Sequence, residues 1–137
     1  MAARRSQRSA CPRLILDSGA VISWSRGDAR TRAILREALA RDLELRIPVV
    51  VLAETLRGGA QDAPVNRVLK AVGTAATMPD TGREAGRLLG QTGGDKTVDA
   101  LVAAEALGIP DSTVLTSDPD DLRALLADHD EIAIQAI

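Results

Sequence analysis

Short aliphatic runs alternate along the chain with stretches whose apolar residues recur at helical spacing. The runs at residues 13–16, 45–51 and 112–116 are bounded by turn signals or helix starts, as is typical of buried strands. Residues 28–41 and 97–107 instead carry apolar side chains every three or four positions, which predicts helices. This alternation predicts an α/β fold with a mainly parallel sheet.

The other expected elements follow from weaker patterns. They are helices that begin near Ser18 and at residues 52–57, 64–72, 81–89 and 119–127, a weak edge strand at 75–78 and a last strand at 131–137. Together they predict one domain over residues 13–137, with a central five-stranded sheet flanked by helices. Residues 1–12 are expected to be a flexible basic tail.

The composition restricts both the core and the partners. With one Trp and no Phe or Tyr among 137 residues, the core must consist of Leu, Val, Ile and Ala. Trp24 is the only aromatic platform for a nucleic-acid base, and we expect it to pack in the core or an interface. A formal charge of −2 gives no overall attraction for phosphate backbones, so an RNA partner would need local arginines or a bound metal.

The cysteine count and the start of the sequence bear on the compartment. The single Cys11 excludes an internal disulfide and fits a reducing compartment, so we expect a cytoplasmic protein. After the basic start, the apolar run that ends at Leu16 is too short for a signal peptide or a membrane-spanning helix. No membrane partner is expected.

Three acidic residues fall at the carboxyl ends of predicted strands. Asp17 follows the first strand, Asp118 follows the strand at 112–116, and Glu54 begins a helix after the second strand. In open parallel sheets, ligands bind at the carboxyl ends of the strands. These three carboxylates should therefore face one rim of the sheet.

A fourth acid, Asp99, lies on a predicted helix. It shares a stripe with Val102, Ala103 and Ala106, so its carboxylate should point toward the packed side. Burial of an unpaired charge is costly unless the carboxylate binds a cation or meets several donors. Asp95 precedes it by four residues, a spacing that would place both acids on one helix face.

Each acid also has a purely structural interpretation. Asp17 can cap the following helix, and Asp118 before Pro119 has the pattern of a helix N-cap. Glu54 and Arg57 have the spacing of a surface ion pair. Asp99 can be a hydrogen-bonded structural residue. One shared site would explain all four positions together, which separate structural roles do not.

Four segments occur in a characteristic order and spacing: residues 14–20 (LILDSGA), 48–57 (PVVVLAETLR), 99–108 (DALVAAEALG) and 114–122 (VLTSDPDDL). With these motifs the chain resembles PIN-domain ribonucleases, specifically VapC-type toxins of toxin–antitoxin pairs. The resemblance extends over residues 13–137.

The resemblance implies an endoribonuclease that hydrolyses RNA with Mg²⁺, or Mn²⁺ in its place, held by the four carboxylates. Mg²⁺ takes oxygen ligands and keeps several waters, so a few carboxylates suffice. We expect Asp17 and Asp99 to be the principal direct ligands, with Glu54 and Asp118 acting through waters or a second ion. The expected supporting residues are Thr116, which would orient a carboxylate or water, Asp121, which competes with Asp118 for the metal, and Asp95.

The resemblance also implies a cognate antitoxin, whose tail would mask the acidic pocket, and a homodimer. From the residues themselves, the clustered arginines at 26, 30, 32 and 36 are candidate RNA contacts: Arg26, Arg30, Arg32 and Arg36. Their alternative role is a solvated helix face.

Two other function classes fit the sequence less well. A PIN-like module that binds RNA or protein without cutting is disfavoured by retention of all four acids. Dehalogenase-like phosphatases require a second Asp two residues after the first, and here Gly19 occupies that position. Receiver domains require a Lys after a late strand, and residues 115–137 contain no Lys.

Overall fold

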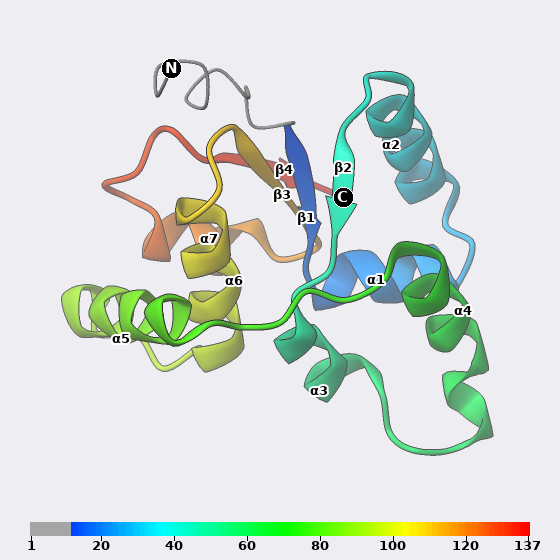
Figure 1. Cartoon of the computed structure of the whole chain (residues 1–137), viewed down its shortest axis with the longest axis horizontal. Helices are drawn as coiled ribbons and strands as arrows, with labels where there is room; N and C mark the ends of the chain where they lie inside the picture. The colour runs from blue at the N-terminus through cyan, green and yellow to red at the C-terminus, as the bar shows by residue number, and fades with distance from the viewer. Residues whose placement is uncertain (1–11) are drawn as a thin grey trace, which may run out of the picture.

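The computed structural model describes residues 12–137, so nearly all of the predicted tail lies outside the described residues. Its centre is a parallel sheet with the strand order β2-β1-β3-β4 (Figure 1). The strands are β1 (Arg13–Leu16), β2 (Glu44–Arg46), β3 (Ser112–Thr116) and β4 (Ala133–Ala136). The predicted α/β class and parallel sheet are confirmed.

Helices lie on both faces of this sheet. They are α1 (Ser18–Ser25), α2 (Ala29–Ala40), the 3-10 turn η2 (Val49–Val51), α3 (Leu52–Thr55), the 3-10 turn η3 (Ala60–Asp62), α4 (Ala63–Val72), α5 (Pro79–Thr92), α6 (Thr97–Leu107) and α7 (Pro119–Leu125). On one face, Ile34 of α2 lines a small hollow with Leu14 and Thr113. On the other face, Glu105 of α6 meets Arg46 of β2. Alternate residues of a strand point to opposite faces, so α2 and α6 cover the two sides.

The predicted count of five strands is wrong, because the described chain forms four. The aliphatic run at 45–51 is a strand only over Glu44–Arg46 and then turns into η2. Pro48 lies between them, and proline has a fixed φ and no N–H for a ladder. The predicted edge strand at 75–78 makes one parallel bridge, from Ala75 to Pro48.

The core is built from small and aliphatic side chains, as the composition predicted. On α6, Ala100, Val102, Ala103 and Ala106 are fully buried, which lets the helix lie close to the sheet and to α5. Trp24 is partly buried and packs against the core, as expected. No helix within residues 12–137 is both long and apolar enough to cross a membrane.

Candidate carboxylate site

Asp17 lies directly after β1 and is only 6% exposed. Its Oδ1 accepts a hydrogen bond of 3.1 Å from the Ala20 N–H, so the carboxylate caps α1. Burial raises the pKa of Asp17, although hydrogen bonds from Thr116 and from the turn backbone oppose the rise. The helix-cap role is therefore real, and it places the carboxylate at the predicted rim.

Thr116 connects the first and last acidic turns. It is fully buried at the end of β3, and its side chain hydrogen-bonds the Asp17 carboxylate. Its Oγ1 also accepts a hydrogen bond of 3.0 Å from the Asp118 N–H. One hydroxyl thus joins the turns that carry Asp17 and Asp118, a contact that favours the predicted orienting role.

The same two turns approach closely at Gly19. A Cβ added there would lie 1.8 Å from the Oγ and 2.8 Å from the Cβ of Ser117. Such distances are shorter than van der Waals contact, so any side chain at this position forces the turns apart. Glycine is required here by the close approach, and the turns after β1 and β3 are held in contact.

We expect Gly19→Ala to lower the free energy of unfolding by about 1–3 kcal/mol, as overpacking does. The melting temperature, followed by circular dichroism, measures this effect. Ser117→Gly in the same chain removes the two nearest atoms and should restore part of the loss. A Gly19→Ala variant with wild-type stability would show that the turns are not tightly packed.

Glu54 lies in α3 and is held by a neighbour from another turn. The Ser18 hydroxyl donates a hydrogen bond of 2.5 Å to Glu54 Oε1. Arg57 does not pair with Glu54 and instead donates to the carbonyl oxygens of Ala53 and Leu56. The ion-pair interpretation of Glu54 is therefore wrong. Sequence reasoning missed Ser18 as its partner, although Ser18 adjoins Asp17 in the same motif.

Asp99 lies in the first turn of α6, partly buried, with its carboxylate among other acids. The predicted apolar stripe is confirmed, since Val102, Ala103 and Ala106 are each 0% exposed. Burial is the largest cause of a pKa raised to about 6, and the charges of Asp121, Glu54, Asp17 and Asp118 raise it further. Carboxylates from separate turns therefore lie close enough to act on one another.

The carboxylate of Asp118 is not used as a helix cap. Asp118 occupies the N-cap position of α7, but its side chain makes no capping hydrogen bond. Asp121, one turn later, is partly buried and is the first of the charges that act on Asp99. Asp118 and Asp121 therefore both belong to the group of carboxylates around Asp99. The choice of Asp118 over Asp121 as metal ligand stays a prediction.

Asp95 was expected on the same helix face as Asp99, and this is wrong because α6 begins only at Thr97. Asp95 still lies at the site, where it lines a cavity of about 260 Å³ together with Glu54 and Asp99. Lys96 lines the same cavity and was not singled out from the sequence. It brings a positive charge to an otherwise acidic rim.

The donor set of this group fits a hard divalent cation. All its ligating atoms are carboxylate and hydroxyl oxygens, which Mg²⁺ and Mn²⁺ prefer over softer metals. Within residues 12–137, no three Asp, Glu, His or Cys side chains converge in a ready coordination geometry. Asp17 accepts its capping bond at Oδ1 and Glu54 accepts from Ser18 at Oε1, so each carboxylate has one oxygen engaged within the chain, and the acids would have to move closer together to share an ion.

The four candidate RNA-binding arginines lie on or before α2. Each is exposed, and none forms an ion pair with a residue of the described chain: Arg26, Arg30, Arg32 and Arg36. Arg30 donates to the Ala136 carbonyl at 3.4 Å, which places it beside the end of β4. Their guanidinium groups are available to an anion, and their role stays a prediction.

Searches of family models and of curated proteins give no match. Several solved structures share the fold. VapBC2 from Rickettsia felis, bound to a promoter DNA fragment, matches with a TM-score of 0.70 and 17% identity over 90% of this chain and 98% of that chain. A toxin–antitoxin complex from Klebsiella pneumoniae matches with a TM-score of 0.66 and 17% identity over 88% and 95% of the two chains.

DNA-bound VapBC from Salmonella typhimurium has a TM-score of 0.64 and 16% identity, with 91% of this chain and 98% of that chain covered. At such identities a likeness establishes the fold. It extends over nearly the whole of each matched chain. The protein therefore has the PIN-like α/β fold that its sequence motifs predict, which it shares with protein chains of VapBC toxin–antitoxin complexes.

Proposed function

We propose that this protein is a metal-dependent endoribonuclease, the toxin of a type II toxin–antitoxin pair, which hydrolyses RNA phosphodiester bonds. The observation that carries the proposal is the group of carboxylates around Asp99. Separate turns bring four other acids close enough to raise its pKa, at a cost that a bound cation would offset. The fold shared with VapBC complexes supports the same activity.

The proposed cofactor is Mg²⁺, which Mn²⁺ can replace. Asp17 and Asp99 would be its direct ligands, with Glu54 and Asp118 acting through waters or a second ion. When bound, the cation would polarise the scissile phosphate and lower the pKa of an attacking water.

The chain's own residues define how the ligands are presented. Thr116 holds the Asp17 carboxylate by its side chain and the Asp118 turn by the backbone N–H. Ser18 holds one oxygen of Glu54. Because Asp118 makes no capping bond, its carboxylate is free to accept a hydrogen bond from a water at the rim. Lys96 supplies a cation toward a substrate phosphate.

The proposed partners are RNA, a cognate antitoxin and a second copy of the chain in a homodimer, all in the cytoplasm. Three of the structurally similar proteins are toxin–antitoxin or VapBC complexes, which supports an antitoxin for this chain. A strongly acidic rim would suit a basic segment of that antitoxin.

Incubation of purified protein with total RNA tests the activity. We expect discrete cuts with Mg²⁺ or Mn²⁺, mapped by sequencing of the new ends, and none with chelator or with Asp17→Asn. RNA binding without cutting in any metal would favour the alternative, a catalytically silent RNA-binding module. Equal cutting by pure Asp17→Asn would contradict the proposed role of Asp17 as a metal ligand.

We also expect the arginines of α2 to contact RNA phosphates. Each contact with a single strand adds roughly −0.7 to the slope of log affinity against log salt. Replacement of Arg30, Arg32 and Arg36 by Gln should make that slope shallower by about 2. Fluorescence anisotropy with Asp17→Asn as the binding-competent background measures it. An unchanged slope would identify these arginines as a solvated helix face.

A further inference from the structure

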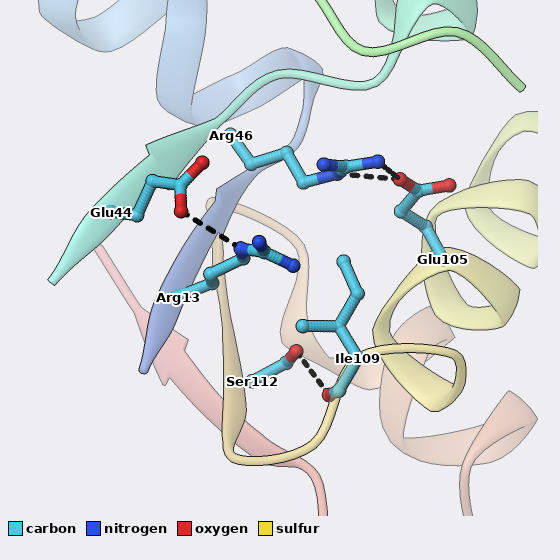
Figure 2. A network of polar contacts seen from close by, with 6 residues as sticks. All are labelled: Arg13, Glu44, Arg46, Glu105, Ile109 and Ser112. Atoms are coloured by element: carbon cyan, nitrogen blue, oxygen red, sulfur yellow. Dashed lines mark hydrogen bonds and ion pairs between the residues drawn. The ribbon is translucent and has the colours of Figure 1, made fainter. Parts of the chain in front are cut away.

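A partly buried ion pair lies outside the carboxylate site, between β2 and α6, where the Arg46 side chain is 27% exposed (Figure 2). Glu105 is only 6% exposed on α6, between the buried Ala104 and Ala106. Both Nε and Nη2 of Arg46 lie 2.6 Å from its Oε1. Sequence reasoning did not single out either residue, because they are 59 positions apart.

Stability does not explain this pair. Removal of two charges from water costs about as much as their attraction returns, and a buried pair replaced by apolar residues of similar volume is often as stable or more so. Every other buried side chain on α6 is Ala or Val, so an apolar residue at position 105 would suit the surroundings. An ion pair differs from an apolar contact in being directional: it fixes the position of β2 relative to α6.

The pair lies where two ligand-bearing segments need to be held in register. β2 is an edge strand that pairs with β1 over only three residues. The chain then continues through η2, which contacts α6, into α3 and Glu54. On the other side, Glu105 and Asp99 lie on one helix, about 9 Å apart along its axis at 1.5 Å per residue.

We propose that Arg46 and Glu105 are positioning residues, whose ion pair fixes the segment from β2 to α3 against α6 and so sets the separation of Glu54 from Asp99. Its expected effect on metal binding rests on the proposed function, whereas its effect on the distance between α3 and α6 does not.

The test variant is Arg46→Met combined with Glu105→Leu. Arg46→Met alone would leave the buried Glu105 charge without its partner and would be destabilising, whereas the double change removes both charges. A second variant, Arg46→Lys, keeps the cation but loses the planar guanidinium with its two donors.

The neighbouring pair Arg13–Glu44 provides a matched control (Figure 2). Its Nε–Oε2 distance is 3.1 Å, it involves the same strand, and its side chains are 28% and 51% exposed. It connects β2 to β1 and not to α6. Arg13→Met combined with Glu44→Leu therefore removes an ion pair from β2 without affecting the proposed link.

The first readout is the distance between spin labels on the exposed residues Ala53 and Thr97, measured by pulsed electron resonance without metal after Cys11→Ser. We expect Arg46→Met/Glu105→Leu to shift or broaden the distance by about 1–2 Å, the size of helix shifts at packed interfaces. Arg46→Lys should give a smaller change, and the control variant none.

The second readout is Mn²⁺ affinity of unlabelled protein, from the resonance signal of free Mn²⁺. Loss of residues that hold metal ligands in place typically costs 10–100-fold, and we expect about 10-fold weaker binding at an unchanged or higher melting temperature. Wild-type label distances and Mn²⁺ affinity in both Arg46 variants would overturn the proposal. Absence of Mn²⁺ binding in the wild type would contradict the proposed function, and the label distance would still decide the positioning role.

Discussion

Asp17→Asn and Asp99→Asn should each slow RNA cleavage by roughly 1000-fold, while the fold is retained. An amide is nearly the same size as a carboxylate but is a poor Mg²⁺ ligand, and several kcal/mol of transition-state stabilisation depend on the metal. The rate is measured on a synthetic RNA that contains a mapped cleavage site, at saturating Mg²⁺.

Asp95→Asn is the matched control, because Asp95 lines the same cavity but precedes α6. We expect less than about a 10-fold loss, as for removal of one charge near the phosphate. Wild-type rates in pure Asp17→Asn or Asp99→Asn would exclude these residues as ligands. An equal loss in Asp95→Asn would place that residue among the ligands.

Metal-free protein should be more stable at moderately acidic pH than at pH 8. The pKa of Asp99 rises from 3.8 to about 6 on folding, so between these values the native state holds a proton that the unfolded chain has lost. Stability therefore falls as pH rises through this window, and the cost is fully present above it. Because Asp99 is only partly buried, solvent screening leaves roughly 1 kcal/mol of the shift.

That cost corresponds to a change of a few degrees in melting temperature. In chelator at pH 8, Asp99→Asn should melt above the wild type, and the difference should vanish below pH 4. Mg²⁺ should raise the wild-type melting temperature preferentially, because it binds the native state. Asp120→Asn serves as control, since that side chain is 92% exposed. A metal-free Asp99→Asn that melts several degrees below the wild type would identify Asp99 as a hydrogen-bonded structural residue.

The part of the fold that could be predicted follows from local pattern. Asp17 and Asp118 were placed at one rim because each follows a short strand, and parallel strands end together. The strand predicted at 45–51 failed at Pro48, where the backbone leaves the ladder although the aliphatic run continues. Three valines in a row have the composition of a buried strand, yet in η2 only Val51 is buried and Val49 is 39% exposed.

The contacts that hold the candidate site together depend on tertiary packing. Ser18 reaches Glu54 across 36 residues, and Arg46 reaches Glu105 across 59. Sequence spacing carries no sign of such pairs. Side-chain geometry was also needed to decide whether each acid is a helix cap: Asp17 caps its helix, whereas Asp118 does not.

Crystals of the wild-type protein soaked with Mn²⁺ test the central claim most directly, because the anomalous signal locates the ion without reference to activity. We predict a peak within about 2.0–2.3 Å of carboxylate oxygens of Asp17 and Asp99, a little longer than Mg²⁺ distances, with Glu54 and Asp118 nearby. Asp17→Asn crystals treated identically should lose it. A peak confined to another acidic group, such as Asp80, Glu84 and Glu131, or no peak in wild-type crystals, would contradict the account.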